Sequence, residues 1–409
     1  MTTKQLIADT LPSGWKIGKL KYFYKFETGF TPPTTRPEYY TPDGEMWVTI
    51  ADMCNSEVTS SKNRISKLYA DSIKAKKVPR GSLLYSFKLS LGKTSIAGCD
   101  TYTNEAIASF SSEKNPCINF LKYSSCMIED NALENIYGAK LLNRERIENA
   151  IIVFPPIKTQ ERIAEYLDKR CSRIDECIKK LQAQLQLVSS YRQSLITRAV
   201  TKGLDGDHQT SFIPLKYLAK LNPDVEQAMS DEIEYLPMEK VKNGMFLHHS
   251  DKLANLPPSL NSFEDGDILL AKVTPCFENG NICLAENCKG GVGRCSTELF
   301  VLRPNPQKVM PKFLMLLLQT QSFKQEAACQ MRGTGGLKRI PADWLCNYKF
   351  PIPSLEKQKQ IVEYMASKHS NLDGLTKKIK DSICLLNDYR SSLISAAVTG
   401  QLAIEEAEE

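Results

Sequence analysis

The chain contains two copies of one sequence pattern, and this internal repeat limits the possible folds more than any other feature. Tyr191–Ile196 reads YRQSLI, and Tyr389–Ile394, 198 positions later, reads YRSSLI. The same offset aligns Pro155 with Pro353 and needs no gap across about fifty residues. A match of this length indicates duplication, so we expect two halves with a related architecture.

Upstream of these preserved segments the two copies diverge. Gly81–Leu84 resembles Gly266–Leu269, and Leu20–Tyr22 resembles Leu215–Tyr217, but insertions shift the offset. Each half is therefore a divergent segment followed by a shorter preserved one. The predicted boundaries are a first globular domain at 1–153, a helix at 154–205, a second globular domain at 206–350, and a helix with a tail at 351–409.

Each preserved segment has the periodicity of a long helix. Apolar residues follow alternating four- and three-residue spacing, which places them on one stripe of a helix. In the first segment only Arg192 interrupts this stripe, and Arg390 takes the same place in the second. Thr159 is the expected N-cap of the first helix and Gly203 its expected end.

A helix of this length with a strip of apolar residues is not stable alone in water, so we expect the two helices to pack as an antiparallel coiled coil. Tyr191, Tyr389 and the two arginines are expected to contact the partner helix or a bound subunit. The predicted interface residues are Leu167, Ile174, Ile178, Leu181, Leu185, Tyr191, Arg192, Leu372, Ile379, Ile383, Leu386, Tyr389 and Arg390.

The divergent segments combine short β-rich runs with turn signals and short helical stretches. Examples are Met46–Ile50 in the first segment and Glu298–Leu302 in the second. The predicted fold class is α+β, with two mixed α/β domains separated by the two long helices.

A glycine-rich basic segment, Arg332–Arg339, lies near the end of the second domain. Glycines let a backbone approach a phosphate closely, and cationic side chains flank these glycines. The first copy keeps only Gly138 and Lys140 of this pattern. A tight surface turn is one interpretation, and contact with a phosphate or a base is the other.

Motifs of common enzymes are missing from the sequence. Gly92–Thr94 resembles the end of a phosphate-binding loop, but Phe87 stands where that loop needs a glycine. Four histidines show no triad or metal pattern. We therefore expect no catalytic residues and no cofactor.

The thirteen cysteines do not predict a metal site either. Cys276, Cys283, Cys288 and Cys295 are spaced by seven, five and seven positions, whereas structural zinc ligands usually pair two to four residues apart. Reduced, half-buried thiols are the expectation. The longest apolar run, Phe313–Leu318, is too short for a membrane span, and the N-terminus lacks the sections of a signal peptide, so a cytoplasmic location is expected.

At this point the residues resemble a known family, the specificity subunits of type I restriction–modification systems. The resemblance is carried by two helices that begin near Pro-x-x-x-x-Gln and end in Tyr-Arg-x-Ser-Leu-Ile-x-x-Ala-Val-Thr. Here they begin at Pro155 and Pro353 and end at Thr201 and Thr399. It implies two target-recognition domains, each reading half of a split DNA sequence.

The same resemblance implies partner subunits and a separate role for each of them. The helices would set the unread spacer and dock two modification subunits, and restriction subunits would complete the complex. The specificity subunit would catalyse nothing. Inserting whole helical turns near Lys180–Leu185 should then change the separation of the half-sites.

Reading bases in the major groove requires Arg or Lys for guanine and Asn or Gln for adenine. The predicted DNA-binding residues are Lys62, Asn63, Arg64, Arg80, Lys88, Lys93 and Lys140 in the first domain, and Lys272, Asn281, Arg294, Arg332, Lys338 and Arg339 in the second.

The net charge of +6 permits binding of double-stranded DNA but is low for a protein that grips DNA alone. Help from partner subunits is therefore expected. Two other functions stay open at this point: a coiled-coil scaffold that joins two protein-binding domains, and a self-contained modification enzyme.

Overall fold

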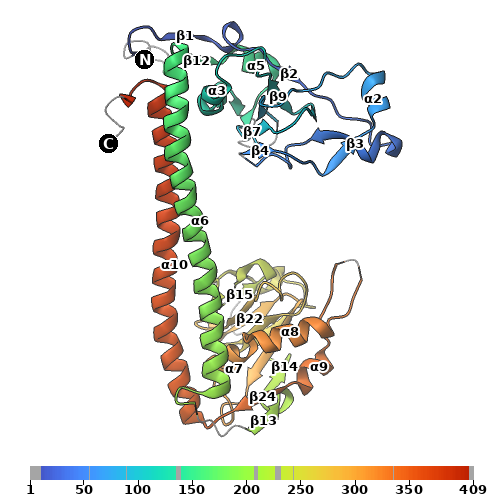
Figure 1. Ribbon diagram of the computed structural model, residues 1–409. Helices are drawn as coiled ribbons and strands as arrows, with labels where there is room; N and C mark the ends of the chain where they lie inside the picture. The colour runs from blue at the N-terminus through green and yellow to red at the C-terminus, as the bar shows by residue number, and fades with distance from the viewer. Residues whose placement is uncertain are drawn as a thin grey trace. The chain divides into compact units, whose positions relative to one another are not determined.

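Two long helices, α6 (Ile157–Lys202) and α10 (Leu355–Val398), each contribute to both compact units of the computed structural model (Figure 1). The model describes residues 11–54, 56–88, 90–134, 140–206, 211–225, 232–242, 244–334 and 336–404. The first unit comprises residues 1–180 and 382–409, and the second comprises residues 181–381. Each unit thus joins a globular part to one portion of each long helix.

The globular part of the first unit contains a five-stranded sheet in the order β2-β9-β6-β7-β4 and a three-stranded sheet in the order β5-β3-β8. Both sheets mix parallel and antiparallel pairs. Their strands are β2 (Glu27–Thr28), β3 (Tyr40–Val48), β4 (Glu57–Val58), β5 (Asn63–Ile65), β6 (Leu83–Ser86), β7 (Thr94–Ala97), β8 (Tyr102–Thr103) and β9 (Ile107–Phe110). The helices are α2 (Lys67–Ser72), α3 (Ile118–Ser124), α4 (Cys126–Glu129) and α5 (Arg144–Asn149). Two further strand pairs are β1 (Lys16–Lys19) with β12 (Ile151–Phe154), and β10 (Leu133–Glu134) with β11 (Lys140–Leu141).

The core of the first unit lies between its larger sheet, its short helices and the long ones. Strand β6 is buried at every position, because its neighbours cover both edges and other elements cover both faces. Leu167, Cys171 and Ile174 of α6 enter this core together with Leu393 and Ala397 of α10. The apolar stripe predicted for the helices therefore packs here.

The second unit has two four-stranded sheets, in the orders β14-β23-β20-β21 and β18-β15-β22-β19. Their strands are β14 (Ala219–Leu221), β15 (Glu232–Leu236), β18 (Ser250–Lys252), β19 (Asn261–Glu264), β20 (Ile268–Ala271), β21 (Ile282–Leu284), β22 (Val292–Cys295) and β23 (Leu299–Pro304). Two small pairs are β13 (Ser211–Pro214) with β24 (Lys349–Ile352), and β16 (Val241–Lys242) with β17 (Met245–Phe246).

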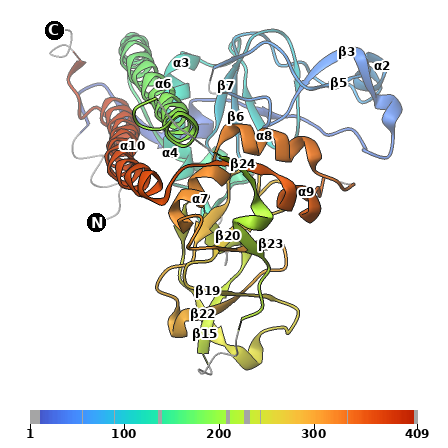
Figure 2. The same cartoon turned by 90° about the horizontal axis from the view of Figure 1, so that it is seen from below.

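Three helices accompany these sheets: α7 (Pro311–Leu318), α8 (Gln321–Gln330) and α9 (Ala342–Asn347). Figure 2 shows α7 beside β20, with β15, β19 and β22 at the far end of the same unit. Helix α7 reads PKFLMLLL and is buried over most of its length, as expected for a helix that is apolar all round. Pro311 at its first turn fits there because that position needs no backbone N–H.

The repeat is visible in matching local structures. Leu20–Tyr22 and Leu215–Tyr217 both form a short 3-10 helix, and the lysine of each donates to an asparagine before the long helix. Lys21 Nζ lies 3.2 Å from Asn149 Oδ1, and Lys216 Nζ lies 2.9 Å from Asn347 Oδ1. The duplication seen in the sequence is therefore a duplication of structure.

The start of each long helix is fixed in the same way in both copies. Gln160 and Gln358 are fully buried, and their Nε2 atoms donate to the carbonyls of Pro155 and Pro353 at 2.8 Å and 3.0 Å. A buried amide needs such a partner, because an unpaired polar group away from water is costly. Each glutamine thus ties the helix to the turn that precedes it.

Thr159 is not the N-cap of the first long helix, contrary to the prediction. The helix begins at Ile157, and the carbonyl of Pro156 accepts bonds from the backbone N–H groups of Thr159 and Gln160. The predicted end is confirmed: Gly203 follows the last residue of α6 with a φ of 71°, which suits glycine.

The two helices run antiparallel within each unit. In the first unit Arg390 pairs with Asp175, and in the second Arg192 pairs with Asp373. Along the predicted stripe, Leu167, Ile174 and Ile379 are buried, whereas Ile178, Leu181, Leu185, Leu372, Ile383 and Leu386 are half-buried. The predicted fold class is confirmed. Among the described helices, none is both long and apolar enough to cross a membrane.

Tyr191 and Tyr389, also predicted as interface residues, are 54% and 55% exposed. Their contact with the partner helix or with a bound subunit stays a prediction.

Candidate nucleic-acid interface

The basic segment Arg332–Arg339 of the second unit forms a hairpin whose base is held by backbone hydrogen bonds. The N–H of Arg332 donates to the carbonyl of Arg339 at 2.9 Å, and the reverse bond measures 2.8 Å. Thr274 fastens the hairpin to the sheet: its Oγ1 donates to the carbonyl of Gly336 and accepts from the N–H of Lys338. Hydrogen bonds therefore hold this segment in a defined conformation. Gly335 within it lies outside the described residues.

Gly333 is required by the close packing of this hairpin. Its φ is 143°, and a Cβ atom added there would lie 2.3 Å from the carbonyl oxygen of Leu337. No side chain fits at that distance, and residues other than glycine rarely adopt this φ. The glycine thus lets the two sides of the hairpin approach each other.

The cationic side chains of the hairpin differ in what they can bind. Arg339 makes a two-pronged ion pair with Glu298, at 3.1 Å from Nε and 2.9 Å from Nη2. That hydrogen bond from Arg339 lowers the pKa of Glu298. Arg332 and Lys338 are exposed and make no such ion pair among the described residues.

Two more predicted residues lie at the base of the same hairpin. The N–H of Ile340 donates to the carbonyl of Lys272, and the Nζ of Lys272 lies 5.4 Å from the centre of the Phe300 ring. Asn281 lies near Lys272, because the carbonyl of Asn281 accepts a hydrogen bond from the N–H of Ala271, the residue before Lys272. We call this set, Lys272, Asn281, Arg332, Lys338 and Arg339, the hairpin cluster.

Arg294 is separate from the hairpin cluster. It lies on β22, in the other sheet of the second unit, and its Nη1 donates to Ser262 Oγ at 2.7 Å and to the carbonyl of Leu260 at 3.3 Å. These bonds tie β22 to its neighbour β19, so Arg294 has a structural partner.

In the first unit, four of the predicted residues gather around the loop that follows β3. Lys62, Asn63 and Arg64 are exposed on and beside β5, with Arg64 donating to the carbonyl of Gly44. The N–H of Lys62 donates to Asp52, and Lys93 Nζ lies 3.2 Å from the carbonyl of Ile50. The loop at 50–52 therefore brings Lys93 towards the β5 residues.

The other three predicted residues of this unit lie elsewhere. Arg80 is exposed, with Nη2 4.0 Å from Glu57 Oε1, and Lys88 is exposed beside the Phe87 ring. Lys140 is near enough to Glu129 to lower that carboxyl's pKa, although burial raises it more. The residues before it, 135–139, including the predicted Gly138, lie outside the described residues.

The structure also points to residues that the sequence did not. Leu337 is 59% exposed between the cations of the hairpin, and Tyr39 stacks on Tyr69 with ring centres 4.1 Å apart next to β5. Apolar and aromatic groups among basic residues are typical of nucleic-acid contacts. The signal was present in the sequence as a leucine inside a glycine-rich basic run.

The cysteines near the hairpin belong to a core. Cys283, Cys288 and Cys295 are buried in one apolar cluster, and burial raises the pKa of Cys283 to about 12. Within the described residues, no group of three or more His, Cys, Asp or Glu side chains is arranged to hold a metal ion. These thiols are packing groups.

A family model for the type I restriction modification DNA specificity domain matches residues 12–187 and 259–384, which is more than half of the chain. The chain belongs to this family. Both matched regions include a globular segment and a portion of a long helix. The family resemblance predicted from the two helical motifs is confirmed.

Relatives within the family include two specificity subunits from Escherichia coli. The EcoEI specificity subunit is 27% identical over 282 residues, covering 67% of this chain and 46% of that subunit. The EcoAI specificity subunit is 26% identical over 282 residues, covering 67% and 47%. The chain spans about half the length of these two relatives.

The fold is shared with a solved structure. One chain from a study of complex assembly and conformational transition of the type I R-M system aligns with a TM-score of 0.70. It is 16% identical, and the alignment covers 96% of this chain and 100% of the other. At this identity the likeness shows the fold alone.

Proposed function

We propose that this chain is a DNA-binding specificity subunit of a type I restriction–modification complex. In this proposal each globular part reads one half of a bipartite DNA target. The observation that carries it is the duplication: two units of one family architecture each present exposed cations on a β-rich globular part. Two divergent globular parts, each joined to a repeated helix, fit a DNA target that consists of two different half-sites.

The predicted DNA-binding residues remain part of this proposal. We divide them into residues that contact DNA and residues that hold the binding surface in shape. Because they are exposed, Arg332 and Lys338 are assigned to phosphate contacts, and Lys62, Asn63 and Arg64 to contacts with base edges or phosphates. Arg339 and Arg294 already have protein partners, so we assign them to holding the binding surface in shape.

The long helices have two roles in the proposal. They set the separation of the half-sites, and they dock two modification subunits, while restriction subunits complete the complex. Tyr191 and Tyr389 support the second role, because they are exposed and occupy equivalent positions in the two copies. Aromatic side chains contribute strongly to binding at protein interfaces.

The chain itself is proposed to be non-catalytic and free of cofactors, with methylation and cleavage carried out by its partners in the cytoplasm. The scaffold alternative differs in one respect: it needs no nucleic acid. Direct binding to DNA therefore separates the two.

The test is binding of duplex DNA by the chain together with its modification subunits, measured across a range of salt concentrations. A specificity subunit predicts that affinity falls steeply with salt, because phosphate contacts release counterions. It also predicts that one sequence is bound at least about a thousandfold more tightly than others. Equal, weak binding to all sequences would favour the scaffold.

A further inference from the structure

Each unit has a cavity where a long helix meets the globular part, and residues at matching positions of the repeat line both cavities. Arg390 and Ile394 line a cavity of about 670 Å³ in the first unit. Arg192 and Ile196, 198 positions earlier, line a cavity of about 420 Å³ in the second. Both volumes fall in the range of small-molecule sites, roughly 300–1,000 Å³.

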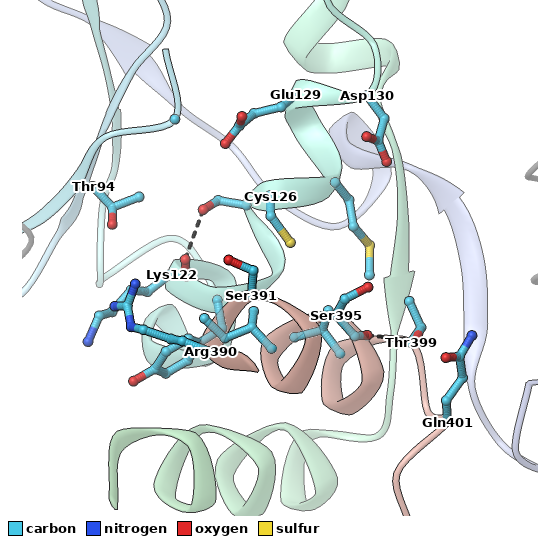
Figure 3. A pocket seen from close by; sticks show the side chains of 16 residues that line it. Thr94, Lys122, Cys126, Glu129, Asp130, Arg390, Ser391, Ser395, Thr399 and Gln401 are labelled. Carbon is cyan, nitrogen blue, oxygen red and sulfur yellow. Dashed lines mark hydrogen bonds between the residues drawn. The ribbon is translucent and has the colours of Figure 1, made fainter. Parts of the chain in front are cut away.

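The cavity of the first unit presents acidic groups (Figure 3). Glu129 and Asp130 lie on one side of it, opposite Arg390 and the hydroxyl groups of α10. Its two cations are already paired, Lys122 with Asp168 at 3.2 Å and Arg390 with Asp175. For Glu129, the described residues provide no hydrogen bond or ion pair, so the charge left over in this cavity is negative.

The cavity of the second unit has the opposite balance. Among its lining residues, Arg192 pairs with Asp373 across the cavity wall. Lys312 pairs with Glu286 at 2.9 Å. Of the basic side chains that line the cavity, Lys324 of α8 and His369 of α10 are in neither of these ion pairs.

Both remaining groups have unused hydrogen-bonding capacity. Lys324 is half-buried, and no acidic side chain in the described part of the unit pairs with it. Desolvation lowers the pKa of Lys324, as expected for an ammonium group that lacks a counter-charge. The Nε2 atom of His369 is buried without a hydrogen-bond partner among the described residues.

We propose that the cavity of the second unit binds a small oxyanion of the phosphate class, with Lys324 as the charged anchor and His369 as part of the cavity wall. An oxyanion would supply the counter-charge that Lys324 lacks, and its oxygens accept the hydrogen bonds that the ammonium group can donate. The cavity of the first unit would repel such a ligand through Glu129. This inference does not depend on the proposed DNA function.

The test is equilibrium dialysis of the full chain with radiolabelled inorganic phosphate at constant ionic strength. We expect one site per chain, and Lys324→Met should weaken binding about tenfold or more, because a hydrogen bond to a charged group is lost. Lys220→Met, on the exposed edge of β14, is the matched control and should bind as the unaltered chain does. Competition with unlabelled adenosine monophosphate shows whether the site prefers a free ion or the phosphoryl group of a nucleotide; displacement by either supports the site.

Methionine has nearly the length of the lysine stem, so the variant should keep the packing of α8. A thermal unfolding transition at the temperature of the unaltered chain verifies that it is folded. If Lys324→Met does not fold, Lys324→Gln, which keeps a polar side chain without the charge, takes its place and should also weaken binding. Undetectable phosphate binding, two equal sites per chain, or unchanged affinity in the folded variant would overturn the proposal.

Discussion

The guanidinium Nε of Arg390 lies 3.4 Å from the carboxylate of Asp175, and the same pair recurs in the other copy of the repeat. Arg192 and Asp373, each displaced by 198 positions, are 2.5 Å apart. In each pair the arginine comes from one long helix and the aspartate from the other. The two arginines interrupt the apolar stripe because each has an acidic partner there.

These pairs should couple the helices weakly but measurably. A double-mutant cycle with Arg390→Met and Asp175→Asn should give a coupling of about 0.2–1 kcal/mol in the free energy of unfolding, because both side chains are partly exposed. Urea unfolding measures it. The exchanged pair Arg390→Asp with Asp175→Arg should recover part of the loss, whereas additive single effects would show that the pair contributes nothing.

Gly333→Ala should disrupt the hairpin cluster. The added Cβ would lie 2.3 Å from the carbonyl of Leu337, so the hairpin must open. DNA affinity of the assembled complex should fall, while the thermal unfolding of the chain changes little. Gly374→Ala is the control, since a Cβ there meets no atom within 4 Å. Normal DNA binding by Gly333→Ala would show that the hairpin does not contact DNA.

Lys338→Ala and Arg339→Ala should behave differently although the residues are adjacent. Lys338 is exposed and unpaired among the described residues, so its loss should weaken binding to all DNA sequences and reduce the salt dependence by about one unit of slope. Arg339 is held by Glu298, so its loss should first lower thermal stability. Lys252→Ala on β18 serves as the control. A salt slope that Lys338→Ala leaves unaltered would remove this lysine from the phosphate contacts.

The stability of the second unit should fall in mild acid through His369. Burial, followed by the positive charge of Arg192, lowers the pKa of His369 below its ordinary value of 6.5. Below pH 6.5 His369 takes up a proton in the unfolded chain but stays neutral in the folded chain, so the free energy of unfolding decreases as pH falls. Between about pH 8 and about pH 5, His369→Gln should lose less stability in urea unfolding than the unaltered chain. Equal losses would show that another group titrates.

The long helices could be predicted because their information is local and repeated. Apolar residues at fixed spacing define the stripe, and Gly203 marks the end of α6. An N-cap at Thr159 would start the helix three residues too late, because the carbonyl of Pro156 accepts the first bonds and Thr159 is not needed as a cap. Such competition between a side chain and the backbone is not visible in a sequence.

The hairpin cluster could be predicted only in part. Its cations were visible as a basic, glycine-rich run, but the pairing of Arg339 with Glu298 joins residues 41 positions apart. The same holds for Thr274, which fastens the hairpin from 62 positions away. Which cations remain available for DNA is decided by these distant partners.

The central claim is that this chain selects one bipartite DNA target through its two divergent globular parts. Methylation mapping of the host genome, with and without the gene for this chain, tests it most directly. The account predicts that deletion removes methylation at one motif made of two half-sites with a fixed spacer. An unchanged methylation map in a strain whose modification subunits are active would contradict it.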